Sequence, residues 1–247
     1  MNGLLRRAAE WPWRILPGGA RLALLKAGIF AAARRPARDA LLELLEIDRV
    51  VSGQIDLASI EYGDGVHVKH RLMAYHDFFV DRINASERVL DVGCGYGAVA
   101  NSIATRAGAR VTGIDMDAGN VDKARRRCAA DNLTFIHGTA PGDLAPEHFD
   151  VIVLSNVLEH IESRQEFLRQ LIVKTTPSRL LIRVPMFDRE WRVPLRQELG
   201  LFHFSDPTHF VEYTRDSFER EMADANLAIA SLQVNWGEIW AEVRPRA

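Results

Sequence analysis

A glycine-rich segment at residues 89–97 (VLDVGCGYG) has the composition of a loop that binds a cofactor. A short apolar run carries Asp91, and three glycines follow at alternate positions, Gly93, Gly95 and Gly97. Because glycine has no Cβ, a strand that stops at such a loop and passes into a helix brings bare backbone close to a ligand. This segment therefore predicts a site for a nucleoside cofactor.

The charges around this loop favour a cationic cofactor over a dinucleotide. The glycines, with Ala98 after them, also fit the dinucleotide fingerprint G-x-G-x-x-G/A. A carboxylate before the first glycine, Asp91, would repel a pyrophosphate, whereas it would attract the ammonium and sulfonium groups of S-adenosylmethionine. A second apolar run, 111–114, ends in Asp115, where a carboxylate can accept hydrogen bonds from ribose hydroxyls. For Asp91 alone, a helix or turn cap is the structural alternative.

Three motifs, in sequence order, resemble those of class I S-adenosylmethionine-dependent methyltransferases. They are residues 90–97 (LDVGCGYG), 114–115 (ID) and 158–161 (LEHI), each placed after an apolar run typical of a buried strand. The resemblance implies an α/β fold: a Rossmann-like, doubly wound, mostly parallel seven-stranded sheet with an antiparallel C-terminal strand, preceded by N-terminal helices. It also implies S-adenosylmethionine as the cofactor.

The same resemblance implies a set of cofactor contacts at the carboxyl ends of the strands. The set is Asp91 at the ammonium group, Gly93, Gly95 and Gly97 against the methionine portion, Asp115 at the ribose, Met116 beside the adenine, and Ser155 and Asn156 toward the sulfonium. Helix capping is the alternative role of Ser155 and Asn156. After the third strand, Thr139 and Ala140 stand where many relatives carry an acid, so we expect Thr139, the backbone or Asp143 to hold the adenine.

Histidines supply the candidate bases, because an attacking hydroxyl or amine must lose a proton near neutral pH. His160 faces the cofactor cleft in the resemblance, and an orienting hydrogen bond is its alternative role. Residues 202–213 (FHFSDPTHFVEY) hold a second group, His203, Asp206, His209 and Glu212. We expect an acid-oriented histidine base there, His209 or His203, with Asp206 and Glu212 near the substrate. The alternatives are a loop held together by its own polar side chains, or metal ligands; we expect no metal.

A third polar group precedes the first strand. His67, His70 and Arg71 would share one face of a helix over 66–83. We expect His70 and Arg71 to bind substrate or the cofactor carboxylate, and a solvated helix face is the alternative.

Alternating strands and helices must position these residues. Strands are predicted at 88–92, 110–114, 134–137, 150–154 and 180–184, with a closing hairpin at 228–236 and 239–243. Helices are predicted at 39–50, 98–106, 117–130, 163–175 and 214–226, with a capping box from Ser163 to Glu166. Residues 185–213 form a long insertion on the substrate side. The predicted domains are a basic helical extension, 1–60, and a methyltransferase domain, 61–247.

Composition limits the partners. The 247 residues carry a formal net charge of −2, which gives no reason to expect nucleic acid, and the two cysteines do not suggest a disulfide framework. Residues 1–38 hold eight Arg or Lys and one acid, Glu10, so their net charge is +7. We expect a cytoplasmic protein. Residues 1–38 have two alternative roles: a helix packed on the domain or on a second subunit with its arginines in water, or peripheral contact with the inner face of a membrane. The sequence does not specify the oligomeric state.

A narrower resemblance concerns bacterial methyltransferases linked with cell-surface polysaccharide or glycolipid biosynthesis. The matching segments are 67–72 (HVKHRL), 181–187 (LIRVPMF), 206–209 (DPTH) and 236–240 (WGEIW). We therefore expect O-methylation of a small-molecule or glycan acceptor, such as a sugar or lipid-linked glycan. The alternatives are a quinone-type molecule or a protein side chain as acceptor, a nicotinamide oxidoreductase, and a non-catalytic binding module.

Overall fold

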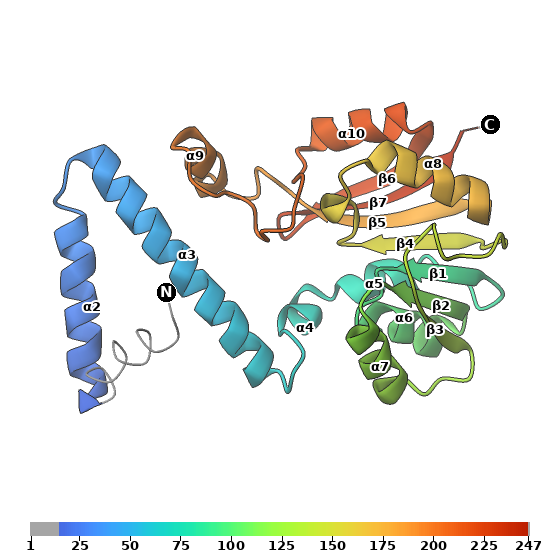
Figure 1. The fold of residues 1–247 in the computed structure, drawn as a ribbon, viewed down its shortest axis with the longest axis horizontal. Coiled ribbons are helices and arrows are strands. Elements are labelled where there is room, and N and C mark those ends of the chain that lie inside the picture. The colour runs from blue at the N-terminus through green and yellow to red at the C-terminus, as the bar shows by residue number, and fades with distance from the viewer. Residues whose placement is uncertain (1–14, 247) are drawn as a thin grey trace. The chain divides into compact units, whose positions relative to one another are not determined.

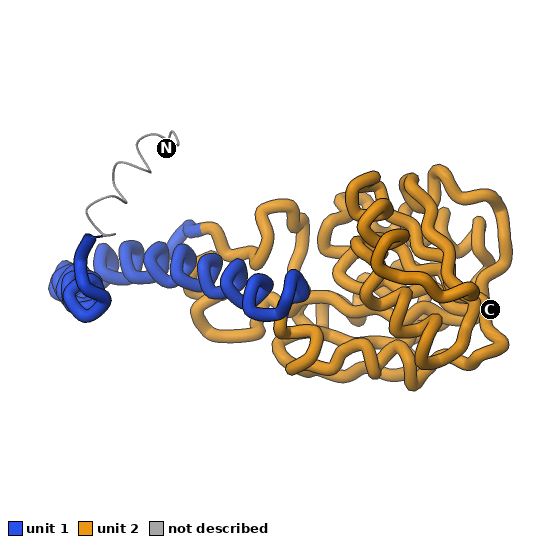
Figure 2. The backbone as a smooth tube through the Cα atoms, turned by 90° about the horizontal axis from the view of Figure 1, so that it is seen from below, with its two compact units in different colours: residues 1–67, 199–201 blue, residues 68–198, 202–247 orange. Residues whose placement is uncertain are grey.

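The computed structural model describes residues 15–246. The chain falls into two compact units, which Figure 2 shows in blue and orange. The first comprises residues 1–67 with 199–201, and the second comprises residues 68–198 with 202–247. No helix in the described part of the chain has the length and hydropathy needed to cross a membrane.

The described part of the first unit contains two helices, α2 (Gly18–Ala32) and α3 (Ala37–Tyr62). A proline precedes each helix, Pro17 and Pro36, at a position where its missing N–H and fixed φ are tolerated. The helix predicted for 39–50 therefore exists but continues to Tyr62. It passes through Gly53, because one exposed glycine weakens a helix by only about 1 kcal/mol.

The second unit contains a seven-stranded sheet in the order β3-β2-β1-β4-β5-β7-β6, shown in Figure 1. The strands are β1 (Arg88–Val92), β2 (Arg110–Asp115), β3 (Leu133–His137), β4 (Val151–Ser155), β5 (Arg179–Pro185), β6 (Leu227–Asn235) and β7 (Glu238–Pro245). The first five are parallel, and β7 runs antiparallel to both β5 and β6. The predicted fold class is confirmed.

Helices cover both faces of this sheet. One face packs on α8 (Arg164–Thr175) and α10 (Arg215–Asp224), and the other on α5 (Tyr75–Val80), α6 (Ala98–Ser102) and α7 (Ala118–Arg127). Strand side chains alternate between the faces, so Ile152 and Leu154 join the first core whereas Val151 and Val153 join the second. Both faces are apolar, as expected for parallel strands buried between helices.

Two segments predicted as helices are helical in large part, but neither is a single α-helix. The helix predicted for 66–83 is two short helices, α4 (Lys69–Met73) and α5, because Ala74 adopts a left-handed φ of 49° that ends the first. Helix α4 begins at Lys69, so His67 lies before the helix that contains His70. Likewise, the helix predicted for 98–106 ends at Ser102, and a π-helical turn, η1 (Ile103–Ala107), completes it.

The capping box predicted at Ser163 is also absent. The Ser163 side chain makes no capping hydrogen bond to α8, and Glu166 binds Arg169 and Gln170 on its own helix instead. A capping box does form at α10, where Thr214 and Ser217 bond reciprocally. The remaining helix, α9 (Arg192–Glu198), lies inside the long predicted insertion.

Candidate functional site

A cavity of about 700 Å³ opens at the carboxyl ends of the parallel strands. Seven of its lining residues were predicted as cofactor contacts or as the base: Gly93, Asp115, Met116, Thr139, Ala140, Asn156 and His160. Much of the remaining lining is apolar: Val92, Ile114, Val157, Ile161, Phe167 and Phe210. Parallel strands order their C-terminal ends at one edge of a sheet, which explains why motifs far apart in the sequence meet here.

Asp91 lies beside this edge as a buried carboxylate. Its Oδ2 atom has no hydrogen-bond partner among the described residues. Burial raises the pKa of Asp91 to about 7, the charge of Asp115 adds to the rise, and the Ala100 N–H opposes it. A buried carboxylate oxygen without a donor is stabilised by a cation, so Asp91 fits the ammonium group of S-adenosylmethionine and does not fit a pyrophosphate.

Asp115 ties the glycine loop to the end of β2. Its Oδ2 accepts a hydrogen bond from the Gly95 N–H at 2.8 Å, and its Oδ1 accepts one from the Asp117 N–H at 2.9 Å. Each carboxylate oxygen keeps a lone pair that can accept from a ribose hydroxyl. A Cβ placed on Gly95 would meet nothing within 4 Å, so the loop leaves room beside the backbone for a ligand.

The other glycines of the loop have different physical roles. Gly97 has a φ of 82°, and a Cβ there would lie 2.7 Å from Cζ of Phe135. Gly93 has a φ of 66°, and its Cβ would lie 2.9 Å from a methyl group of Val157 in the cavity wall. Close packing therefore requires glycine at Gly97 and Gly93, whereas only Gly95 faces open space.

Asp143 hydrogen-bonds Thr139 at the wall of the cavity where the adenine is expected to bind. Its Oδ2 accepts hydrogen bonds from both the N–H and the hydroxyl of Thr139, each at 2.8 Å. The pKa of Asp143 is lowered, first by the Thr139 N–H. Asp143 thus fixes Thr139, and the cavity is lined there by Gly138, Thr139 and Ala140.

Asn156 and Ser155 end β4 in different environments. Asn156 has a left-handed φ of 58° and its side-chain amide donates to Oε1 of Glu159 at 2.6 Å. A non-glycine residue in this region is strained and is held there by its surroundings. Ser155 accepts a weak bond from Arg183 at 3.3 Å, and it does not line the cavity. Neither side chain caps a following helix.

Sequence reasoning missed a buried ion pair next to this site. Arg183 donates to Glu238 through Nε at 2.5 Å and Nη2 at 2.6 Å, and its guanidinium lies 3.7 Å from the centre of the Tyr75 ring. Arg183 and Asp91 both project from the sheet face that carries Val153 and Leu181, as their alternation along β1 and β5 requires. An arginine inside an otherwise apolar strand (RLLIRVP) was the available signal.

His160 is held in one tautomer by a short chain of hydroxyl contacts. Oγ1 of Thr208 donates its proton to Oδ1 of Asp206 at 2.6 Å and therefore accepts from Nδ1 of His160, 2.8 Å away. The Nε2 atom of His160 is then the unprotonated nitrogen. The pKa of His160 is lowered, chiefly by burial and next by the charge of His209, so the neutral ring dominates at neutral pH.

His209 lies against His160, with ring centres 4.6 Å apart in an edge-to-face arrangement. Its Nδ1 lies 3.1 Å from Oε1 of Glu212, a carboxylate with no side-chain exposure. Glu212 also accepts hydrogen bonds from Arg189 and from the N–H and hydroxyl of Ser205. Burial alone would raise the pKa of Glu212, but these donors, His209 first, lower it to about 2.

His203, also predicted as a base, does not take part in the contact between His160 and His209. Among the contacts of His203, its ring packs on Phe187 and Phe204, with ring centres 5.8 and 4.5 Å away. The metal alternative drawn from His203, Asp206, His209 and Glu212 is not the group that the fold assembles. The structure instead gathers Glu159, His160 and His209, whose possible ligand atoms all lie within 4.8 Å of one another. These three side chains could hold one cation.

The group before β1 forms a separate polar network. Tyr75 Oη lies 2.9 Å from Nδ1 of His70, and Nε2 of His76 lies 3.1 Å from the same atom. His76 contacts Ser102 at 2.7 Å, and burial lowers the pKa of His76 to about 4, so this ring is neutral. Arg71 is exposed, so the structure separates His70 from Arg71 and links His70 to the aromatic side chains around the glycine loop.

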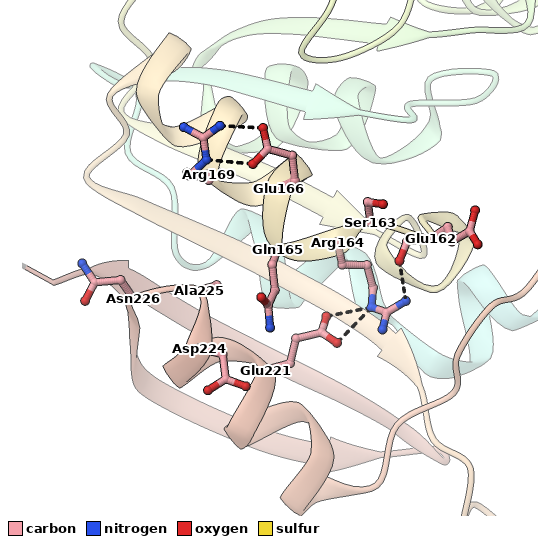
Figure 3. Close-up of a pocket in the computed structure, with 10 residues that line it drawn as sticks. All are labelled: Glu162, Ser163, Arg164, Gln165, Glu166, Arg169, Glu221, Asp224, Ala225 and Asn226. Carbon is pink, nitrogen blue, oxygen red and sulfur yellow. Dashed lines mark hydrogen bonds and ion pairs between the residues drawn. The ribbon is translucent and has the colours of Figure 1, made fainter.

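A second hollow, of about 610 Å³, lies between α8 and α10 (Figure 3). Two pairs of its charged side chains face each other: Arg164 Nε bonds both carboxylate oxygens of Glu221 at 2.9 Å, and Arg169 bonds Glu166. Paired charges on a polar surface do not define a ligand. The cavity that contains His160 is therefore the candidate active site.

Comparison with known proteins agrees with this geometry. The sequence model of a family described as a methyltransferase domain matches residues 65–232. The chain belongs to this family of methyltransferase domains, which confirms the predicted enzyme class and its cofactor, S-adenosylmethionine. The predicted link with polysaccharide biosynthesis receives no support from these comparisons.

The curated relatives are named as O-methyltransferases of ubiquinone biosynthesis. The chain is 35% identical over 103 residues to the mitochondrial ubiquinone biosynthesis O-methyltransferase of Schizosaccharomyces pombe. The matched segment covers 40% of this chain and 37% of that protein. It is 42% identical over 79 residues to the ubiquinone biosynthesis O-methyltransferase of Vibrio cholerae. This second matched segment covers 30% of this chain and 32% of the relative. The matched segments thus span about a third of the relatives' length.

Solved structures share the fold. The magnesium protoporphyrin IX methyltransferase of Synechocystis, solved with bound S-adenosylhomocysteine, superposes with a TM-score of 0.59 at 18% identity, over 73% of this chain and 85% of that one. The O-methyltransferase NcsB1 from neocarzinostatin biosynthesis was solved with S-adenosylhomocysteine and 1,4-dihydroxy-2-naphthoic acid. It gives a TM-score of 0.57 at 21% identity, over 83% of this chain and 61% of that one.

Proposed function

We propose that this chain transfers the methyl group of S-adenosylmethionine to a hydroxyl oxygen of a small aromatic acceptor of the phenol or quinol type. The observation that carries the proposal is the fixed tautomer of His160, whose unprotonated Nε2 belongs to a side chain that lines the cavity together with Gly93 and Asn156.

The cofactor end of the site is assigned to carboxylates and bare backbone. Asp91 would hold the ammonium group, Asp115 the ribose hydroxyls, and Thr139 with its neighbours the adenine. S-adenosylmethionine supplies an electrophilic methyl group, and an in-line displacement needs mainly that the acceptor be positioned and water excluded. The apolar lining of the cavity, including Phe167 and Phe210, serves the second requirement.

His160 is assigned as the general base. Nε2 of His160 would take the proton of the acceptor hydroxyl as that oxygen bonds to the methyl carbon, the carbon–sulfur bond breaks and S-adenosylhomocysteine leaves, and the Thr208–Asp206 contact would stabilise the imidazolium. His209, fixed by Glu212, supports the ring of His160 from one side and is the second candidate for the same role. Such a base contributes about 10²- to 10⁴-fold to the rate.

Two observations favour an aromatic acceptor over a glycan. The cavity wall near His160 is formed by Ile161, Phe167 and Phe210, which suit a flat apolar ring. The curated relatives are named for ubiquinone biosynthesis, which matches the quinone-type alternative from the sequence. Sugars and lipid-linked glycans are therefore the competing acceptors in the test.

The test is a transfer assay with labelled S-adenosylmethionine against two acceptor sets, ortho-dihydroxyphenols with hydroquinones, and monosaccharides with lipid-linked glycans. Each set is run with a chelator and with added Mg²⁺ or Zn²⁺, because Glu159, His160 and His209 could hold a cation. We expect label in the phenol set, and its loss in His160→Gln, while S-adenosylhomocysteine still binds that variant.

The outcomes separate the parts of the proposal. Label in glycans alone would reject the acceptor class and keep O-methylation. Binding of NAD in place of S-adenosylhomocysteine in calorimetry would reject the cofactor assignment itself. Full activity of His160→Gln would remove His160 as the base.

A further inference from the structure

Three side chains that can ligate a metal come together beside the candidate active site. Glu159 and His160 belong to a 3₁₀ turn, η2 (Leu158–His160), and His209 comes from the insertion. One potential ligand atom from each side chain lies within 4.8 Å of the other two. The Phe210 N–H donates to the Glu159 carbonyl at 2.8 Å, so the backbone ties the insertion to the turn at this point.

The carboxylate of Glu159 has the features of a metal ligand. The residue is 0% exposed, and its Oε1 accepts from the side-chain amide of Asn156 at 2.6 Å. Its Oε2 is also buried and has no hydrogen-bond partner in the described part of the chain. A buried carboxylate oxygen costs free energy unless a donor or a cation compensates it. A cation that binds Oε2 would remove this cost.

Both histidines present Nε2 as the atom that can bind a cation. The hydroxyl of Thr208 accepts from Nδ1 of His160, and the carboxylate of Glu212 accepts from Nδ1 of His209 at 3.1 Å. Each ring therefore keeps its lone pair on Nε2. Histidines that ligate a metal almost always donate their other N–H in this way, which fixes the ring in the ligating orientation.

We propose that Glu159, His160 and His209 bind one divalent cation of the Zn²⁺ class, through one carboxylate oxygen and two imidazole nitrogens. Zn²⁺ takes such ligands at about 2.0–2.2 Å, which places the ligand atoms about 3.4 Å apart. Small rotations of the three side chains close the present spacing to that value. Mg²⁺ and Ca²⁺ prefer oxygen ligands, so two imidazoles favour Zn²⁺ over them.

Access and charge both suit a cation here. His160 is exposed and lines the cavity, so a cation can enter from there, whereas the side chain of His209 is only 5% exposed. Arg189 pairs with Glu212, but Glu159 has no ion pair with the described residues. A cation would give the second buried carboxylate its counter-charge.

The cation and the proton of the acceptor hydroxyl compete for one atom. In the proposed function, the lone pair on Nε2 of His160 takes that proton. The same lone pair cannot bind a cation at the same time, so Zn²⁺ should inhibit methyl transfer reversibly. This inhibition rests on the proposed function, whereas binding of the cation does not.

The first experiment titrates the metal-free full chain with Co²⁺, a coloured substitute for Zn²⁺. We expect one Co²⁺ per chain, with the strong visible absorption of a site that has few ligands, and displacement of Co²⁺ by Zn²⁺. Glu159→Gln and His209→Gln lie on different segments, and each should weaken binding by about 100-fold or more. Circular dichroism that matches the unmodified chain shows that the variants fold.

The matched control is His148→Gln. His148 also contacts a carboxylate, that of Asp150 at 3.2 Å, but it lies at the N-terminal end of β4, away from the cavity. This variant should bind Co²⁺ as tightly as the unmodified chain does.

The second experiment measures methyl transfer to hydroquinones, which do not chelate Zn²⁺, while the Zn²⁺ concentration is varied. We expect full activity with a chelator, and inhibition whose midpoint matches the dissociation constant for Zn²⁺. His148→Gln should show the same midpoint.

The outcomes separate the cation site from the proposed function. Binding that is unchanged in Glu159→Gln and His209→Gln, or no saturable binding up to about 1 mM Co²⁺, overturns the site. A reaction that requires Zn²⁺ supports the site but overturns the competition, and with it the role of His160 as the base. If no acceptor is methylated under any condition, the proposed function fails, and the Co²⁺ titration still decides the site.

Discussion

Thr208 accepts a hydrogen bond from Nδ1 of His160 at 2.8 Å because its own proton is committed to Asp206 at 2.6 Å. This relationship sets the tautomer of His160 through a neutral hydroxyl group in place of a carboxylate in direct contact with Nδ1. The pKa of His160 stays low, and the ring enters the reaction as a neutral base.

Replacing the threonine should therefore alter the rate more than cofactor binding. We expect Thr208→Val to lower kcat by about tenfold or more, because the other tautomer would present an N–H to the acceptor. Thr208→Ser should restore most of the rate, since it keeps the hydroxyl. Equal kcat values for Thr208→Val and the unmodified enzyme, measured with saturating acceptor, would contradict this role.

The raised pKa of Asp91 predicts a pH dependence of cofactor binding. An ammonium group beside Asp91 requires the carboxylate form, and the pKa of about 7 in the free protein means that this form is scarce at pH 5.5. Affinity for S-adenosylhomocysteine should thus rise from pH 5.5 to 7.5, with proton release detectable by calorimetry in buffers of different ionisation enthalpy. Asp91→Asn should bind weakly and show a flat profile over the same range.

Glu159 should make the stability of the unliganded protein depend on pH. Its side chain is buried, one of its oxygens has no partner among the described residues, and burial raises its pKa to about 7. The folded pKa lies above the usual value of 4.5, so the stabilisation is complete below that value and is lost as pH rises through 7. Thermal melts should show Glu159→Gln losing less stability than the unmodified chain between pH 5.5 and 8. Parallel slopes would argue against a titrating Glu159.

The glycines should separate folding from binding. Gly97→Ala forces a Cβ toward Phe135 at a positive φ, so we expect about 1–3 kcal/mol of lost stability in urea unfolding. Gly95→Ala meets no neighbour and should cost less, about 1 kcal/mol from its φ of 54°, yet weaken S-adenosylhomocysteine binding. The reverse order, with Gly95→Ala the less stable variant, would show that the space beside Gly95 is not reserved for a ligand.

Breaking the buried ion pair should be the most destabilising single change. Arg183→Met leaves Glu238 without its two guanidinium donors, and removal of one partner of a buried pair costs about 3–5 kcal/mol. The double variant Arg183→Met with Glu238→Gln should recover part of this loss. A double-mutant cycle in urea tests the coupling, and additive losses would mean that the pair is not coupled.

The sequence by itself determined the parallel sheet and the sheet edge at which we propose that the cofactor binds. Apolar runs that end in Asp91, Asp115 and Ser155 define strands, and parallel strands bring their C-terminal ends to one edge whatever lies between them. Each of these strand patterns can be recognised within a few residues, and parallel order then brings their ends together. The fold class and the cofactor could therefore be predicted from the sequence.

Only the tertiary structure decided which side chains meet at the reacting end. His160 and Thr208 are 48 positions apart, Arg183 and Glu238 are 55 apart, and no periodicity links either pair. Tyr75 likewise contacts His70 across the break at Ala74, where one residue at positive φ redirects the chain between α4 and α5. Contacts of this kind depend on how an irregular segment packs on the sheet, and short-range sequence patterns carry no record of that packing.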